Sequence, residues 1–488
     1  MQFLSREMRT ISDDSSHDHG HGQNRFAVIP TAQKLGVDSS LGGRGVTIAF
    51  LDSGFYPHPD FADRVVAFHD VTKAERAFHK LTTPGGHHWH GTQTVVSCAG
   101  DGSLSDGIYR GLAHEAGLVL VKVSDDGRIT DVGIEAGLRW IIDHRERYKI
   151  QVLNMSLGAD LDLSESESRI NQLASELVER GVVITVAAGN SVDKRPVPPG
   201  SSGSVITVGG YSDENQFDES RFDLYHSSHG ATIDGLIKPE IIAPSMYVAA
   251  PILPGTKEYV VAEALSILDS TPDYGLKNVA RTSRQAAGLG SDVLELDNTG
   301  LRHLISQKLA ERKIVATHYQ HVDGTSFAAP IVASVAAQML EVNPSLTPDA
   351  IKNILISTAS RLGSHPNVRQ GFGIVCAHRA VLAARRERHL DDTSYFPPRI
   401  DGRRIIFCYH DDEAESVALA ADFNGWEARS SSLVKQTDGL WRLEVPCLPA
   451  GTYRYKYLVN GSRWIEDPSH GYKEDDGHGG FNSLLTIV

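Results

Sequence analysis

The chain has 488 residues, more than one ordinary hydrophobic core holds, which predicts two or three domains. Its 47 basic and 61 acidic residues give a formal net charge of −14, which disfavours a nucleic-acid-binding surface. The four cysteines, Cys98, Cys376, Cys408 and Cys447, have no paired spacing, so neither a disulfide framework nor a zinc site is expected. Residues 1–10 lack the apolar core of a secretory signal, and no run reaches membrane-spanning length, so we expect a cytoplasmic protein without a membrane partner.

Residues 1–25 form a polar segment with three histidines, His17, His19 and His21, near its middle. We expect a disordered tail, because nothing apolar would hold the segment against a core. Metal capture by the three histidines is the alternative. We assign no metal ligands elsewhere in the chain.

Between residues 26 and 388 apolar strand-like runs alternate with helix-like segments, which predicts an α/β domain whose parallel sheet is covered by helices on both faces. The expected strands are Val46–Leu51, Leu118–Val123, Gln151–Leu157, Val182–Ala188 and Val205–Gly209. The expected helices have a 3.6-residue period and are Asp131–Tyr148, Ser166–Arg180 and Ser326–Leu340. A further helix should begin at Thr347-Pro348-Asp349, which combines a capping hydroxyl with proline at the first helical position.

Four polar residues stand at the ends of these elements. Asp52 ends a strand, His90 precedes an apolar segment, and Asn190 follows a strand. Ser326 opens the alanine-rich helix, where unpaired N–H groups and the helix dipole favour negative charge. A serine nucleophile needs a base, a third group that orients the base, and a donor for the oxyanion, and these residue types supply all of them.

Each of the four residues lies in a short motif. The motifs are Asp-Ser-Gly at Asp52, His-Gly-Thr at His90, Ala-Ala-Gly-Asn ending at Asn190, and Gly-Thr-Ser-Phe-Ala-Ala-Pro around Ser326. Together, in the order acid, histidine, serine, they resemble the signature blocks of the subtilisin-like serine proteases over roughly residues 26–386. The resemblance implies a subtilisin-like fold and a serine endopeptidase with an Asp52–His90–Ser326 triad and Asn190 in the oxyanion hole. It implies no cofactor for the chemistry; calcium is common in such relatives, but we assign it no ligands.

Two further segments fit the groove for a protein or peptide substrate that this resemblance implies. The segment Ser156-Leu157-Gly158 resembles the strand that pairs with an extended substrate, and Gly127-Arg128-Ile129 is expected on the substrate's other side. We expect Gly189 to line the same groove. A simple strand end is the alternative for residues 156–158.

Residues 252–320 form an insertion relative to this family. The insertion contains helix-like stretches at Lys257–Leu268 and Gly300–Glu311. A wall for the substrate groove, a restriction of access, an assembly surface and a plain surface elaboration all fit the sequence.

After a linker expected at residues 389–399, residues 400–488 change to short strands with alternating side chains. Tyr453, Tyr455 and Tyr457, for example, alternate with Arg454 and Lys456. This pattern predicts a small immunoglobulin-like β-sandwich.

Several blocks of this domain form a second pattern, among them Asp422-Phe423-Asn424-Gly425-Trp426, Gly439-Leu440-Trp441 and Phe481-Asn482-Ser483. They resemble the glycogen-binding module of AMP-activated protein kinase β subunits and of starch-branching and debranching enzymes. The resemblance implies that Trp426 and Trp464 stack on glucose rings, while Lys456 and Asn482 bond the sugar hydroxyls. A structural or peptide-binding role for the domain is the alternative.

The two resemblances together predict a serine endopeptidase that its C-terminal domain holds on glycogen or another α-glucan. The alternative is a glycogen-associated binding or regulatory protein whose protease fold is latent. The sequence does not predict an oligomeric state.

Overall fold

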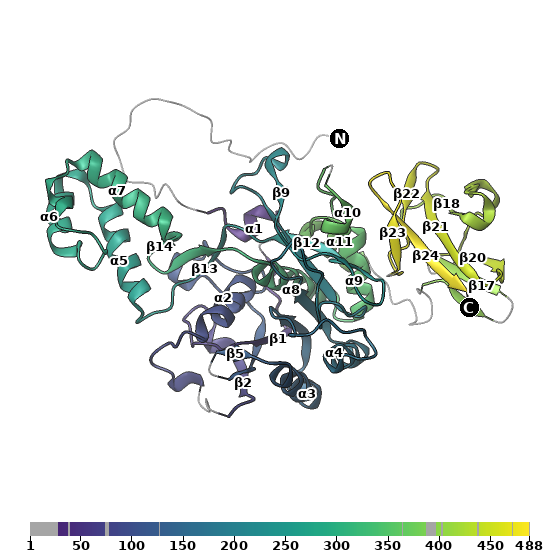
Figure 1. Ribbon diagram of the computed structural model, residues 1–488, viewed down its shortest axis with the longest axis horizontal. Coiled ribbons are helices and arrows are strands. Elements are labelled where there is room, and N and C mark those ends of the chain that lie inside the picture. Colours follow the sequence, from purple (N-terminus) through teal and green to yellow (C-terminus); the bar gives the residue numbers. More distant parts are fainter. Residues whose placement is uncertain are drawn as a thin grey trace.

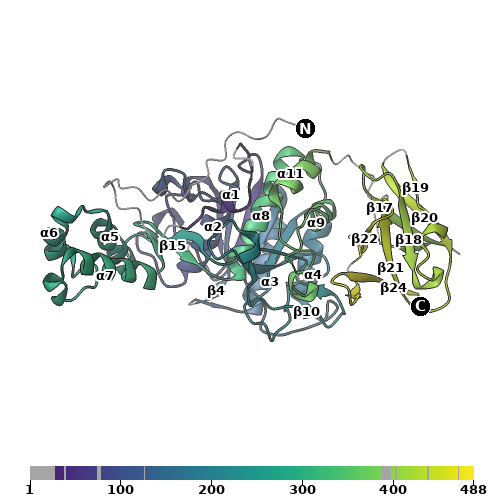
Figure 2. The same ribbon diagram turned by 90° about the horizontal axis from the view of Figure 1, so that it is seen from above.

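The computed structural model describes residues 28–37, 40–73, 78–125, 127–363, 365–386, 397–401, 404–436, 439–470 and 472–487. The predicted tail at 1–25 and residues 389–396 of the predicted linker lie outside these ranges. A central α/β domain lies between a helical insertion at one end of the molecule and a β-sandwich at the other (Figure 1). The view from above shows the same order along the long axis (Figure 2).

An eight-stranded sheet forms the centre of the α/β domain. Its parallel strands follow the order β2-β3-β1-β6-β7-β8-β12, and β9 pairs antiparallel with β8. The strands are β1 (Thr47–Asp52), β2 (Val65–Asp70), β3 (Gly117–Lys122), β6 (Ile150–Met155), β7 (Val183–Ala187), β8 (Ile206–Ser212), β9 (Asp223–Leu224) and β12 (Ile241–Pro244). The α/β class and the parallel sheet are therefore confirmed, and all five predicted strands are present. The prediction missed β2, a partly exposed edge strand, the two-residue β9, and β12, which is short and ends in proline.

Both faces of the sheet are apolar because successive side chains of a strand point to opposite sides. In β1, Ile48 and Phe50 pack into one core, whereas Ala49 and Leu51 pack into the other. The first core is covered by α2 (His88–Ala99), α8 (Thr325–Val342), α9 (Pro348–Ser357) and α11 (Ala377–Arg386). The second core is covered by α3 (Asp131–Tyr148) and α4 (Arg169–Glu179).

Helix α8 is the central helix of the first face. Among the described residues, it is the one helix that is long and apolar enough to cross a membrane. The expectation that no segment of the chain reaches membrane-spanning length is therefore corrected for this helix. However, 83% of it is buried inside the protein, as in the core helix of a globular domain.

The predicted start of α9 is confirmed. Thr347 caps the helix by accepting a hydrogen bond from the N–H of Ala350 at 3.2 Å, and Pro348 is the first helical residue.

The insertion consists of three helices with a hydrophobic core of their own, α5 (Lys257–Ser270), α6 (Asp273–Ser283) and α7 (Asn298–Glu311). Its two ends are joined by an antiparallel sheet of β13 (Val248–Pro251), β15 (Tyr319–Val322) and β14 (Ile314–Ala316). The two helices predicted here are confirmed, and α6 was missed.

The C-terminal domain is a sandwich of two antiparallel sheets, as predicted. One sheet contains β16 (Arg399–Asp401), β17 (Arg404–His410), β20 (Leu440–Pro446) and β19 (Val434–Lys435). The other contains β18 (Val417–Ala421), β21 (Gly451–Val459), β24 (Phe481–Ile487), β23 (Lys473–Asp475) and β22 (Arg463–Ile465). Aromatic side chains such as Phe407, Tyr455 and Tyr457 fill the space between the sheets.

Specific contacts fix the sandwich to the α/β domain. Arg361 forms an ion pair with Glu466 at 2.6 Å and donates a second hydrogen bond to the carbonyl of Gly479 at 3.1 Å. The ammonium of Lys473 lies 3.6 Å from the ring centroid of Phe372. Since Glu466 and Lys473 are both buried, these contacts hold the two domains in one arrangement.

Candidate active site and carbohydrate face

Asp52 and His90 are in direct contact. Asp52 is buried at the end of β1, and its Oδ1 lies 2.8 Å from Nδ1 of His90 in α2. The same carboxylate accepts hydrogen bonds from the N–H of Ser53 at 2.7 Å and from the hydroxyl of Thr94 at 3.4 Å. These donors fix the carboxylate, which in turn holds the proton of His90 on Nδ1 and leaves Nε2 as an acceptor.

A glycine allows this contact. A Cβ atom on Gly91 would stand 2.2 Å from the carbonyl oxygen of Gly54 and 3.1 Å from Cβ of Asp52. Any other residue would therefore push α2 away from the end of β1. This explains in physical terms why glycine follows histidine in the His-Gly-Thr motif.

The environment of His90 favours its charged form. Burial alone would lower its pKa, but the charge and the hydrogen bond of Asp52 more than offset this, so the pKa of His90 is raised above its ordinary value of 6.5. The His90 side chain is 39% exposed, so its ring also remains open to a ligand.

Ser326 is the second residue of α8, and a chain of hydrogen bonds from the sheet holds its backbone. Its carbonyl oxygen accepts a hydrogen bond from the hydroxyl of Ser156 at 2.7 Å. Ser156 accepts from Nδ2 of Asn154 at 3.0 Å, and Asn154 Oδ1 accepts from the hydroxyl of Thr185 at 3.2 Å. These hydrogen bonds thus fix the position of the Ser326 backbone relative to β6 and β7.

The ring of His90 lies 6.0 Å from that of Phe327, the residue after Ser326, measured between ring centroids. Among the contacts of the described residues, no hydrogen bond joins the Ser326 hydroxyl to His90. In ligand-free enzymes the bond between base and nucleophile is often long and shortens when substrate binds.

Asn190 lies just beyond β7, at the N-terminus of α8. Its Oδ1 accepts hydrogen bonds from the N–H of Thr325 at 2.9 Å and from the Thr325 hydroxyl at 3.0 Å. The N–H of Gly189 donates to the same hydroxyl at 3.1 Å. Because Thr325 engages the oxygen of the amide, the Asn190 Nδ2 group is left as the donor on the other side.

The two predicted groove segments lie on either side of β1. Residues 156–158 follow β6, and residues 127–129 form the turn and second strand of the hairpin β4 (Ser124–Asp125) and β5 (Arg128–Ile129), which follows β3. Both β3 and β6 pair with β1, so the segments flank the strand end that carries Asp52. Ser156 itself turns its hydroxyl to the backbone of Ser326, a supporting contact that the sequence did not predict.

The sequence analysis also missed Thr94, Thr325, Asn154 and Thr185. Two of them carried a usable signal: Thr94 stands four residues after His90, on the same side of a helix, and Thr325 adjoins Ser326. The other two act through the register of β6 and β7, which pairs Asn154 with Thr185. Over the described ranges, no group of three or more His, Cys, Asp and Glu residues that could hold a metal ion is found.

The residues predicted to bind carbohydrate lie on or beside the outer face of the five-stranded sheet. Tyr455 and Tyr457 point into the sandwich core, so Lys456 between them belongs to the outer face. Trp464 stands opposite Leu458, which also belongs to this face, and is 49% exposed. Asn482 lies between the buried residues Phe481 and Ser483, which places it on the same face.

Two of these residues are already bound by acids. Trp426 donates from Nε1 to Oδ1 of Asp422 at 3.1 Å, and Asp422 Oδ2 accepts from the N–H of Arg454 at 2.9 Å. Lys456 is 8% exposed, and its ammonium forms an ion pair with Asp476. The indole of Trp464 is therefore accessible and Trp426 is partly exposed, whereas the lysine is covered.

The sequence matches two family models. Residues 43–373 match the Subtilase family, and residues 395–474 match carbohydrate-binding module 48, the isoamylase N-terminal domain.

Individual relatives agree with these matches. The chain is 30% identical over 390 residues to serine protease AprX of Bacillus subtilis (strain 168), which covers 78% of this chain and 73% of that protein. It is 31% identical over 299 residues to subtilisin-like protease 1 of Trichophyton rubrum, over 56% of this chain and 52% of that protein. The crystal structure of fervidolysin from Fervidobacterium pennivorans, a keratinolytic enzyme related to subtilisin, shares the fold with a TM-score of 0.51 and 19% identity over 88% of this chain and 55% of that one. The chain therefore belongs to the subtilase family of serine proteases and carries a carbohydrate-binding module 48 at its C-terminal end.

Proposed function

We propose that this protein is a serine endopeptidase in which Ser326 is the nucleophile, His90 the general base and Asp52 the group that orients the base. The observation that carries the proposal is the 2.8 Å contact between Asp52 Oδ1 and His90 Nδ1, within the motifs of a subtilase. Because Nδ1 holds its proton toward the carboxylate, Nε2 is the nitrogen that accepts the proton of the Ser326 hydroxyl.

The reaction then follows the acyl-enzyme route. The Ser326 oxygen bonds to the scissile carbonyl carbon as its proton moves to His90 Nε2, and Asp52 stabilises the imidazolium. The oxyanion receives hydrogen bonds from Nδ2 of Asn190 and from the N–H of Ser326 in the first turn of α8. When the C–N bond breaks, His90 returns the proton to the leaving amine. A water molecule, activated by the same histidine, then hydrolyses the ester.

The substrate in this proposal is an extended segment of a protein or peptide. It lies across the end of β1, between residues 127–129 and 156–158, with Gly189 beside the oxyanion site. Main-chain hydrogen bonds to such strand-like segments depend little on side chains, so they fit a broad substrate range.

A second part of the proposal assigns α-glucan binding to Trp426, Lys456, Trp464 and Asn482, with glycogen as the ligand in a cytoplasmic setting. The match to carbohydrate-binding module 48 and the common outer face of three of these residues support it. The accessible indole of Trp464 suits the apolar face of a sugar ring. Lys456 would have to exchange Asp476 for a sugar hydroxyl.

The protease assignment is tested by labelling the folded full-length chain with a fluorophosphonate. We expect a covalent adduct on Ser326 in the wild-type protein and none in Ser326→Ala, with both proteins unfolding at the same temperature. Absence of labelling in folded wild-type protein would instead favour a binding or regulatory protein with a latent protease fold.

The glucan assignment is tested by affinity electrophoresis in gels that contain amylose. The double variant Trp426→Ala/Trp464→Ala should lose its retardation. Tyr274→Ala is the matched control, because Tyr274 is an aromatic residue of the insertion that is 92% exposed. Equal retardation of the double variant and the wild type would refute this site.

A further inference from the structure

A cleft with a volume of about 660 Å³ separates the sandwich from the α/β domain. Helices α9 and α11 form one wall, and β22 with the loop after β17 forms the other. A volume of this size lies within the range of roughly 300–1,000 Å³ that is usual for small-molecule sites. Trp464 of the proposed glucan site belongs to the lining.

We propose that this cleft continues the α-glucan site, so that one sugar chain stacks on Trp464 and is bound on its other side by polar side chains of α9. The inference rests on the proposed glucan function and extends it to the protease domain.

The polar wall is a regular row on one side of α9. Asp349, Asn353 and Ser357 are spaced four residues apart, so they lie on one face of the helix, and all three line the cleft. Within the described ranges, the side chains of Asp349 and Asn353 form no hydrogen bond to another protein group. Their oxygen and nitrogen atoms are therefore available to a ligand in the cleft.

The two walls offer the two kinds of contact that a glucose unit needs. A pyranose ring has apolar faces, which suit the indole of Trp464, and a rim of hydroxyl groups, which both donate and accept hydrogen bonds. Asn353 offers an amide donor and acceptor, Asp349 offers acceptors, and Ser357 offers a hydroxyl. The sandwich wall also carries polar side chains, among them Asp412 and Arg463, so the row on α9 adds partners for the sugar hydroxyls on the opposite side of the cleft.

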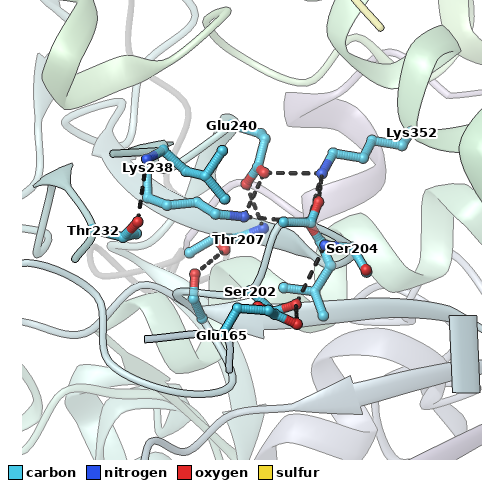
Figure 3. Close-up of polar contacts among 12 residues, drawn as sticks. Glu165, Ser202, Ser204, Thr207, Thr232, Lys238, Glu240 and Lys352 are labelled. Atoms are coloured by element: carbon cyan, nitrogen blue, oxygen red, sulfur yellow. Dashed lines mark hydrogen bonds and ion pairs between the residues drawn. The ribbon is translucent and has the colours of Figure 1, made fainter. Parts of the chain in front are cut away.

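Helix α9 is anchored to the α/β domain through Lys352, which lies about one helical turn after Asp349. Its ammonium lies 3.0 Å from Glu240 and donates to the carbonyls of Gly203 at 2.7 Å and Val205 at 2.9 Å (Figure 3). Glu240 in turn binds Lys238 at 2.5 Å and the N–H of Thr207 at 2.8 Å.

The opposite wall is fixed by the ion pair between Arg361 and the buried Glu466. Two walls that are already in place lower the ordering cost of binding. A sugar chain that spans the cleft would touch both domains, whereas a short sugar on Trp464 would touch only the sandwich. The affinity of the full-length protein should therefore rise with chain length, and part of that rise should depend on α9.

The test is isothermal titration of the full-length protein with maltose and with maltoheptaose. We expect Asp349→Ala/Asn353→Ala to weaken maltoheptaose binding at least fivefold and to leave maltose binding unchanged. His378→Ala, an exposed residue of α11 outside the cleft lining, is the matched control and should bind both sugars like the wild type. If the double variant unfolds at a lower temperature than the wild type, Asn353→Ala alone is the test. We then expect its affinity for maltoheptaose to fall at least twofold.

The outcomes separate this inference from the proposed glucan function. Unchanged maltoheptaose affinity in the α9 variant, together with a loss in Trp426→Ala, overturns the cleft and leaves the face of the sandwich as the site. No binding by the wild-type protein overturns both.

Discussion

Both proposed sites pair a basic side chain with a carboxylate, but the two pairs leave the base in different states. Asp52 contacts Nδ1 of His90 and leaves Nε2 available on a ring that is 39% exposed. Asp476 binds the ammonium of Lys456 itself, and Lys456 is 8% exposed. The proposed catalytic base therefore has its acceptor nitrogen available for substrate, whereas the lysine must first give up its partner. A residue can stand at the position that its motif predicts while its functional atom is occupied.

The strength of the Lys456–Asp476 pair is reflected in the pKa of Asp476. Burial alone would raise the pKa of Asp476, but Lys456 and the N–H groups of His478 and Gly480 lower it to about 2. The carboxylate therefore stays charged at any pH where the enzyme would work, and the ion pair persists until a ligand competes for it.

Disrupting the Asp52–His90 pair should have the largest effect on activity. In Asp52→Asn an amide replaces the carboxylate and favours the tautomer of His90 with its proton on Nε2, where it cannot accept the serine proton. We expect kcat on a peptide substrate to fall about 10⁴-fold, the size known for this change in a serine-protease triad. Thr94→Ala, which removes the 3.4 Å contact to Asp52 and a 2.9 Å hydrogen bond to the carbonyl of Gly91, should lose less than tenfold. Equal losses in the two variants would show that the carboxylate has no special role.

The oxyanion donor should come next. Asn190→Ala removes Nδ2 but leaves the nucleophile and base, so kcat should fall about 10²–10³-fold with little change in KM, the range known from the corresponding amide in subtilisin. Asn190→Asp is a useful companion, since it retains the acceptor for Thr325 but offers no donor. A large rise in KM with unchanged kcat would mean that Asn190 binds substrate in its ground state.

The raised pKa of His90 predicts the acid limb of the pH profile. Only neutral His90 can act as the base, so kcat/KM should fall about tenfold for each unit of pH below the His90 pKa, which lies above 6.5 in the free enzyme. The residual activity of Asp52→Asn should show this limb at lower pH, because the charge that raises the pKa is gone. A limb below 6.5 in the wild-type enzyme would contradict the assignment of the base.

Breaking the second pair should have the smallest effect, and in the opposite direction. Asp476→Asn weakens the hold on Lys456 and frees its ammonium for a sugar hydroxyl, so maltoheptaose should bind up to about fivefold more tightly, because binding no longer has to break the covered ion pair. Glu474→Gln removes one negative charge from a neighbouring residue that pairs with Arg454 instead, and it should leave affinity unchanged. Weaker binding in Asp476→Asn would indicate that the acid, rather than the lysine, contacts the sugar.

Sequence and structure agree best where a functional residue ends a strongly apolar element. The strand before Asp52 and the helix after Ser326 were evident from their composition, and α3 spans the predicted residues Asp131–Tyr148. The order of the motifs along the chain then indicated that these distant residues belong together, and the sheet brings them to one edge.

Agreement is poorest where partners meet through register or through loops. The hydrogen bond between Thr185 and Asn154 exists because β6 and β7 pair at that position. The Lys456–Asp476 pair joins β21 to the loop between β23 and β24. Neither partner has a local sequence signal, because both contacts arise only when strands far apart in the chain come together.

The insertion is attached to the rest of the enzyme more closely than its place at one end of the molecule implies. Trp89, the neighbour of His90, packs against its hydrophobic core, and Gln93 of α2 donates to the carbonyl of Pro251 at 3.3 Å, where the insertion is entered. Trimming these helices away would uncover an indole and loosen the helix that carries the base. A shortened enzyme would therefore lose activity through a displaced imidazole, even if its groove became easier to enter.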